Sequence, residues 1–305
     1  MKNKSGKFCL LGSKIQYSLS PEIQNFIFER DGIDAHYELV DIPEDSLTPD
    51  KFNELVKSYD GFNVTTPFKT IVAGYLKGKL DKYAAKTGSV NTVKVDPDGE
   101  AHGFNTDVIG LRQGMFDLIA AQTFFPSRLI LLGGGGVARS VIYSFIDYHT
   151  IYGIPKIPEI IVLMRDPLKN AELVNAIAGM TAGWTRIRLQ FEEWNDDQIA
   201  HFVSRSGFII NASSCGSVSN PKKDAFDFTG RNLSLQKRLV VGDLVYNPSE
   251  TIFLNTARGE GAVVIGGLGV LVYQAIASAE VWQATHVSEE GIFNQLEKIG
   301  FTWIR

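Results

Sequence analysis

The chain has 305 residues, a length at which we expect about two domains because hydrophobic cores stop growing at roughly 250 residues. Hydrophobic residues form 44% of the chain and charged residues 21%, which excludes the disordered and fibrous classes. The net charge of -4 argues against nucleic acid or an anionic membrane as a partner, because phosphate binding needs clustered Lys and Arg.

The N-terminal segment, the cysteines and the histidines exclude further classes. Residues 1–15 carry positive charge but only a short apolar run, so we expect neither a signal peptide nor a spanning helix, and a cytoplasmic protein. Cys9 and Cys215 are the only cysteines and make neither a zinc site nor a disulfide framework. The five histidines show no ligand spacing, so no metal is predicted.

The first hundred or so residues alternate short apolar runs with segments of helical periodicity. Residues 8–12 and 35–42 are predicted strands, and 21–32 and 50–59 are predicted helices, the first capped by Ser20. A further strand over 61–69 is broken at Pro67, and a hairpin over 88–107 turns at residues 96–99. Together these segments predict a mostly parallel α/β sheet.

A second α/β series follows a predicted helix over residues 108–121. Residues 127–146 combine an apolar strand, a glycine turn and a helix, and residues 159–166 form the next strand. Three more strands are predicted over 207–214, 238–246 and 261–267. No repeat of 20 to 50 residues is present, which argues against a solenoid.

The glycine turn of this second series predicts a dinucleotide site. Gly133, Gly135 and Ala138 satisfy the pattern G-x-G-x-x-[GA] between a strand and a helix. Gly133 would permit a tight turn, Gly135 a close approach to a pyrophosphate, and Ala138 tight packing of helix on strand. The helix N-terminus at Gly136 adds unpaired amides and a partial positive charge. Glycines that merely make a turn would show the same pattern.

The end of the next strand bears on the choice between NAD and NADP. Asp166 suits the ribose hydroxyls of NAD, whereas Arg165 and Lys169 could pair with the extra phosphate of NADP. The carboxylate follows the glycines by more than the usual distance of about 20 residues because of an insertion at 148–158. Since a carboxylate repels a 2′-phosphate, we expect NAD or the use of both cofactors.

Polar residues gather at predicted strand ends in the first half of the chain. They lie in the motifs SLSP (18–21), NVTTPFK (63–69), NT (91–92) and NTD (105–107). Hydroxyl, amide, ammonium and carboxylate groups together suit a small substrate rich in hydroxyls with one carboxylate. These motifs therefore predict a substrate site.

At these motifs the sequence closely resembles the shikimate dehydrogenase family, including its quinate/shikimate dehydrogenase branch. The resemblance covers nearly the whole chain through eight motifs in the family's order: SLSP, NVTTPFK, GSVNT, GFNTDVIG, GGGGVAR, NASSCG, YNPSET and GLGVLVYQA. It implies reversible NAD(P)-dependent oxidation of shikimate to 3-dehydroshikimate, with quinate as a second substrate that would give 3-dehydroquinate.

The resemblance also implies residue roles by position. Lys69 and Asp107 would form the catalytic pair, which removes the alcohol proton as hydride leaves carbon. The remaining roles follow the same motifs: Ser18, Ser20 and Tyr246 on the substrate carboxylate, Thr65, Asn91 and Gln274 on ring hydroxyls, and Asn211 beside the cofactor.

Four of these residues have a plainer structural interpretation. Lys69 could be a solvated surface lysine, and Asp107, Ser18 and Ser20 could be helix caps or turn formers. Gln274 lies in an apolar helix, where its amide needs a partner that a ligand would supply.

Several positions depart from the family pattern. They are Lys14 and Tyr17 in the first motif, Gly266 and Val270 in the last, and residues 164–166 after the second strand of the nucleotide domain. These changes alter the edges of the pocket and the cofactor clamp but not the catalytic pair. A dehydrogenase of another cyclic hydroxy acid, such as quinate alone or aminoshikimate, and a non-catalytic nucleotide-binding regulator therefore stay open.

Two α/β domains follow from these observations. We expect a substrate-binding domain over residues 1–112, completed by 270–305, and a Rossmann-type nucleotide domain over 113–269, with the active site in the cleft between them. The expected partner is a small-molecule substrate. A homodimer is compatible with the sequence, which does not set the oligomeric state.

Overall fold

The computed structural model describes residues 5–121, 128–151, 159–182, 187–203, 207–220, 224–230, 239–283 and 286–304. Its contacts divide the chain into two compact units: Met1–Gly110 with Leu271–Gly300, and Leu111–Val270 with Phe301–Arg305. The last five residues, which we expect in the substrate-binding domain, group with the second unit. Residues 152–158 of the predicted insertion lie outside the described ranges. None of the described helices is long and apolar enough to span a membrane.

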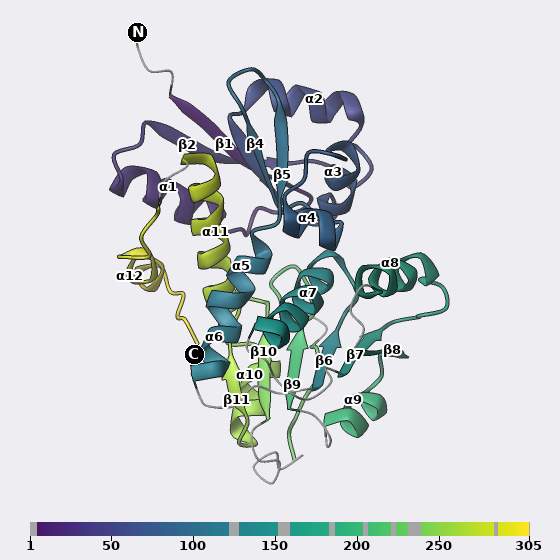
Figure 1. The fold of residues 1–305 in the computed structure, drawn as a ribbon. Helices are drawn as coiled ribbons and strands as arrows, with labels where there is room; N and C mark the ends of the chain where they lie inside the picture. The colour runs from purple at the N-terminus through teal and green to yellow at the C-terminus, as the bar shows by residue number, and fades with distance from the viewer. Residues whose placement is uncertain are drawn as a thin grey trace. The chain divides into compact units, whose positions relative to one another are not determined.

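The first unit contains a five-stranded sheet in the order β2-β1-β3-β4-β5, of which β2, β1, β4 and β5 are labelled in Figure 1. Its strands are Gly6–Gly12 (β1), Ala35–Asp41 (β2), Gly61–Val64 (β3), Thr92–Val95 (β4) and Ala101–Phe104 (β5). β1 pairs parallel with β2 and β3, whereas β3, β4 and β5 pair antiparallel, so the sheet is mixed. β4 and β5 form the predicted hairpin, whose turn contains Gly99 at a φ of 86°.

Helices cover both faces of this sheet. Cys9 and Leu11 of β1 belong to a buried cluster with side chains of three helices, while Phe8 contacts the rings of Phe28 and Trp282 on the other face. Such alternation is what a strand buried on both faces requires. The helices with residues in this unit are Ser20–Arg30 (α1), Pro49–Ser58 (α2), Lys69–Tyr75 (α3), Lys82–Thr87 (α4), Asp107–Leu111 (α5), Leu268–Gln283 (α11) and Ile292–Lys298 (α12). The chain passes from one unit to the other within α5 and within α11.

The second unit contains a six-stranded parallel sheet in the order β11-β10-β9-β6-β7-β8. Its strands are Arg128–Leu132 (β6), Glu159–Met164 (β7), Arg188–Glu193 (β8), Phe208–Asn211 (β9), Val240–Asp243 (β10) and Val263–Ile265 (β11). The chain order reverses between β6 and β9. In sheets of this kind, ligands bind outside the carboxyl ends of the strands at that reversal.

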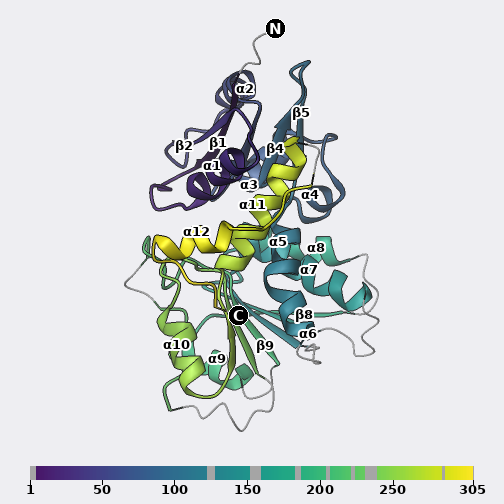
Figure 2. The same cartoon turned by 90° about the vertical axis from the view of Figure 1, so that its left-hand side faces the viewer.

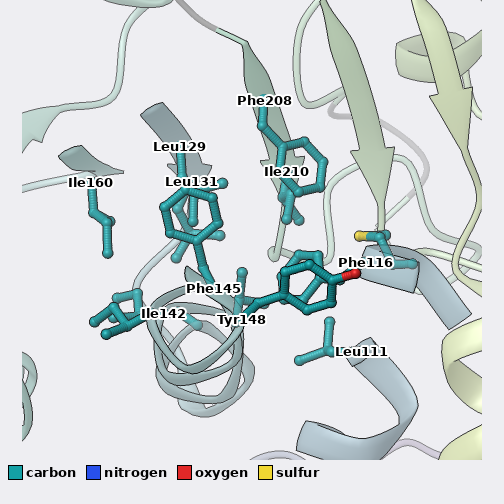
Figure 3. Close-up of a cluster of buried hydrophobic side chains, with 14 of the residues drawn as sticks. Leu111, Phe116, Leu129, Leu131, Ile142, Phe145, Tyr148, Ile160, Phe208 and Ile210 are labelled. Carbon is teal, nitrogen blue, oxygen red and sulfur yellow. The ribbon is translucent and has the colours of Figure 1, made fainter. Parts of the chain in front are cut away.

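Two apolar clusters hold helices on opposite faces of the second sheet (Figure 2). Leu131 and Ile210 point toward Phe145 of α7 and toward Phe116 (Figure 3). Alternate residues of the same strands pack against α9 and α10. The helices here are a π-helical turn over Arg112–Phe116, Asp117–Ala121 (α6), Gly136–Ile151 (α7), Ala171–Thr181 (α8), Asp196–Val203 (α9) and Ile252–Gly259 (α10).

The structure corrects the sequence-based expectation at several elements. The strand β8 was not expected, because it lies at the sheet edge and few of its residues are apolar. Ser20 does not cap α1: it is the first helical residue, and its N–H donates to the Ser18 hydroxyl at 3.2 Å. Lys169 lies in the loop before α8.

Candidate active site

Lys69 and Asp107 form a buried ion pair within the first unit. Lys69 begins α3, after β3 and Pro67, and Asp107 begins α5, after β5. The ammonium Nζ of Lys69 lies 2.7 Å from Oδ2 of Asp107, and each residue is 8% exposed. Lys69 is therefore not a solvated surface lysine. Because solvent is largely excluded, the two charges interact more strongly than a surface pair at the same distance.

The second carboxylate oxygen of Asp107 has a different partner, Asn91. Asn91 Nδ2 donates to Asp107 Oδ1 at 2.8 Å. The orientation of the Asn91 amide follows from its other end, because Oδ1 accepts the backbone N–H of Thr106 at 2.7 Å. Both oxygens of Asp107 are thus bonded to side chains of the unit, which is more than a helix cap requires.

The other predicted substrate residues of the first unit are less fully bonded. The Gln274 amide donates to the Leu271 carbonyl at 2.9 Å and accepts from Asn91 at 3.3 Å, so its partners are protein groups. Ser18 and Ser20 are joined through their hydroxyls at 3.2 Å. Thr65 is half-buried, and its hydroxyl bonds to no described residue. The Thr65 hydroxyl is therefore available to a ligand.

Tyr246 belongs to the second unit, where it follows β10 by three residues and is half-buried. Ser18 and Ser20 belong to the first.

The glycine turn lies at the chain reversal of the second sheet, between β6 and α7. Gly133 has a φ of 103°, and a Cβ there would lie 3.2 Å from Cβ of Ser213, so only glycine suits the turn. A Cβ added at Gly135 would meet no described atom within 4 Å, and α7 begins at Gly136. The backbone of the turn is thus open at Gly135, directly before a helix N-terminus. Ala138, two residues into the helix, is buried in the core. These features fit the pyrophosphate of a dinucleotide.

Asn211, at the end of β9, is fully buried and bonded to protein. Its amide donates to Oδ1 of Asp243 at 2.9 Å and to the Cys215 carbonyl at 3.1 Å, while its oxygen accepts the Ser213 N–H at 3.0 Å. Asp243 also accepts from the Thr251 hydroxyl at 2.7 Å, and complete burial raises its pKa to about 7. Asn211 therefore shapes the loop that faces Gly133 and presents no free side-chain atom of its own.

Opposite charges meet in the loop after β7. The Asp166 carboxylate accepts the backbone N–H of Lys169 at 3.0 Å and pairs with its ammonium at 2.9 Å. The backbone bond, followed by the ammonium, holds the pKa of Asp166 below its usual value. Arg165 is exposed and makes no ion pair with any described residue. Both the NAD-type carboxylate and the NADP-type cation are thus on the surface of this loop.

Sequence reasoning gave no role to several buried polar residues of these sites. Ser278 lies four residues after Gln274 on α11, and a second polar residue on the same face of an apolar helix was the available signal. Asp243 stands in the otherwise uncharged segment 239–246, where a charge needs buried partners. Within the described ranges, no group of three or more His, Cys, Asp or Glu side chains could hold a metal ion.

Comparison with known proteins decides the family. Residues 10–93 match the family described as the shikimate dehydrogenase substrate binding domain. A Bacillus cereus protein named shikimate dehydrogenase (NADP(+)) is 33% identical over 273 residues, which cover 90% of this chain and 91% of that protein. The chain belongs to the shikimate dehydrogenase family. The resemblance inferred from the motifs is confirmed, and the chain is an NAD(P)-dependent oxidoreductase.

Solved structures confirm the α/β fold. A chorismate mutase/shikimate 5-dehydrogenase fusion protein from Clostridium acetobutylicum is 28% identical, with a TM-score of 0.75 and coverage of 97% of both chains. The quinate dehydrogenase from Corynebacterium glutamicum in complex with NAD is 24% identical, with a TM-score of 0.78 and coverage of 97% of this chain and all of that one. At that identity, the second likeness concerns the fold alone.

Proposed function

We propose that this chain catalyses the reversible NAD(P)-dependent oxidation of shikimate to 3-dehydroshikimate, with Lys69 and Asp107 moving the alcohol proton. The buried ion pair, with 2.7 Å between Nζ and Oδ2, is the observation that carries this proposal. A nucleotide-binding regulator would not need an ammonium and a carboxylate held together out of water, where burying charge is costly.

The proton balance follows from the pair. When bound, NAD(P) would supply the hydride acceptor for oxidation of the alcohol carbon and the hydride donor for reduction of the ketone. In reduction, the Lys69 ammonium donates a proton to the carbonyl oxygen as negative charge develops there, and Asp107 stabilises the ammonium beforehand. In oxidation, the pair starts with one proton fewer and accepts the hydroxyl proton. Because Asn91 holds the other oxygen of Asp107, the carboxylate cannot rotate away from Lys69.

The substrate contacts are assigned from the motifs. Ser18, Ser20 and Tyr246 would hold the carboxylate, and Thr65 and Gln274 would bind ring hydroxyls. The free hydroxyl of Thr65 supports this assignment, since it has no protein partner among the described residues. Asn91 Nδ2 has two hydrogens and three acceptors, so Asn91 would contact the substrate only by giving up Thr106, at 2.9 Å, or Gln274, at 3.3 Å, while keeping Asp107.

The backbone around Gly133, Gly135 and Gly136 would hold the pyrophosphate. We propose that the chain uses NAD or both cofactors, because the Asp166 carboxylate, in the loop after β7, would repel a 2′-phosphate bound there. Lys169 neutralises part of that charge and Arg165 has no ion pair in the described chain, which supports dual use rather than exclusion of NADP.

Steady-state kinetics with four pairings, shikimate or quinate with NAD or NADP, test the proposal. We expect the highest kcat/KM with shikimate, measurable turnover of quinate, and activity with both cofactors. Turnover of quinate alone would move the assignment to another cyclic hydroxy acid. Folded protein without turnover in any pairing would overturn the proposed function. The homodimer and the cytoplasmic location expected from the sequence stay predictions.

A further inference from the structure

Three buried hydroxyls meet next to Asn91 in the first unit. Ser278 Oγ lies 2.9 Å from Thr92 Oγ1 and 3.0 Å from Thr106 Oγ1, and the two threonine oxygens are 3.1 Å apart. All three residues are at most 2% exposed. We call this group the hydroxyl triangle. It joins α11 to β4 and to the residue directly before Asp107.

The hydrogen positions in the triangle follow from counting donors. Each hydroxyl has one hydrogen, and a carbonyl oxygen can only accept. Ser278 donates to the Gln274 carbonyl at 2.9 Å, and Thr92 donates to Asn91 Oδ1 at 3.1 Å. The Asn63 amide donates to Ser278 at 2.9 Å. The Thr106 hydrogen has two acceptors in reach, Ser278 Oγ at 3.0 Å and Asn91 Oδ1 at 3.2 Å. Because the two lone pairs of Asn91 Oδ1 already accept the Thr92 hydroxyl and the Thr106 N–H, we infer that the Thr106 hydrogen points to Ser278.

This direction matters for the ion pair. With its hydrogen turned to Ser278, the Thr106 oxygen offers a lone pair to Asn91 Nδ2 at 2.9 Å. The other N–H of Asn91 then points to Asp107 Oδ1 at 2.8 Å. If Ser278 lost its hydroxyl, the Thr106 hydrogen would turn to Thr92 or to Asn91 itself. The competing bonds would then loosen the amide that holds Asp107.

We propose that Ser278 is a positioning residue for the proton-transfer pair, acting through Thr106 and Asn91 on the carboxylate of Asp107. The proposal rests on the proposed function, since it concerns the efficiency of that proton transfer. The Ser278 hydroxyl donates to the Gln274 carbonyl and accepts from the Asn63 amide, so its bonds are to protein groups. Removing this hydroxyl should therefore change kcat rather than the affinity for either ligand.

The test compares three variants of the full chain. Ser278→Ala removes the hydroxyl from the triangle, and Ser278→Thr keeps a hydroxyl at that position. Ser89→Ala is the matched control, because Ser89 is fully buried in the same unit and its hydroxyl has no partner among the residues that the structure describes. For each we would measure kcat, KM for shikimate and for the cofactor, the pH dependence of kcat, and Tm.

We expect Ser278→Ala to lower kcat about fivefold to tenfold, the equivalent of one lost hydrogen bond, with both KM values within about twofold. The pH dependence of kcat should move by about half a unit. Ser278→Thr should restore both readouts and Ser89→Ala should change neither. An unchanged kcat and pH profile in Ser278→Ala, or the same loss in Ser89→Ala, overturns the positioning role. Absence of turnover in the wild type instead overturns the proposed function, and the positioning role with it.

Discussion

The candidate residues of the two units differ in how many of their polar groups are already bonded to other protein groups. In the first unit Lys69, Asp107 and Asn91 are buried and bonded to one another before any ligand binds. In the second unit the glycine turn presents open backbone, and the Lys169 side chain is 86% exposed. Proton transfer needs a geometry fixed in advance, whereas a dinucleotide can be recognised by backbone amides and a helix terminus. Substitutions in the first group should therefore change turnover, and those in the second should change affinity.

Lys69→Ala should have the largest effect, a fall in kcat of about 100-fold or more, because the proton loses its donor and acceptor. Cofactor affinity, measured by fluorescence titration, should stay within about twofold of wild type if Lys69 acts in proton transfer and not in cofactor binding. Lys77→Ala, at an exposed lysine of the same unit, is the control. A rate close to wild type in Lys69→Ala would remove Lys69 from the mechanism.

Gly135→Ala should weaken cofactor binding on the order of tenfold, because its Cβ would occupy the place of the pyrophosphate. The fold should tolerate it, since that Cβ meets no described atom within 4 Å. Gly133→Ala is the contrasting variant: its φ of 103° should cost stability, by about 1 kcal/mol or more in urea unfolding. Undiminished affinity in Gly135→Ala would show that this backbone does not face the cofactor.

Asp243→Asn should change how stability depends on pH. Burial raises the pKa of Asp243 from 3.8 to about 7, so the folded state binds this proton more tightly than the unfolded state. The stability that protonated Asp243 contributes to the folded state is fully present below the unfolded pKa and is lost as pH rises to about 7. Unfolding free energy should therefore fall less steeply in the variant over that range, by up to about 1.4 kcal/mol per pH unit.

Urea unfolding at several pH values measures this difference, with Asp45→Asn, at an exposed carboxylate, as the control. Parallel curves for wild type and Asp243→Asn would mean that Asp243 titrates alike in the folded and unfolded states.

Asp166→Ala should have the smallest effect, a shift of about threefold to tenfold in the ratio of kcat/KM for NADP to that for NAD. The variant removes a carboxylate that repels the 2′-phosphate and frees the Lys169 ammonium. Lys169→Ala should move the same ratio the other way. Equal ratios in wild type and Asp166→Ala would show that Asp166 does not face the ribose.

Much of the fold followed from local patterns. The strands β1, β6, β7, β9 and β10 and the helices α1, α2, α7 and α11 lie where apolar periodicity predicts them, since a buried strand or helix face marks its own sequence. The edge strand β8 was not predicted because its residues are only partly buried, so they lack the apolar pattern of a buried strand. The expectation that Ser20 caps α1 was wrong by one residue: the N-cap position falls on Leu19, and residue patterns do not fix a helix end that closely.

The sequence by itself determined the alternation of strands and helices, the glycine turn and the motifs that identify the family, because each of these depends on residues that are close together in the chain. Only the tertiary structure decided which polar groups share bonds. Asn91 lies 16 residues from Asp107 in the chain, and Thr106 lies 172 residues from Ser278. Hydrogen bonds between such distant side chains depend on how helices and strands pack in space, and composition and periodicity carry no record of that packing.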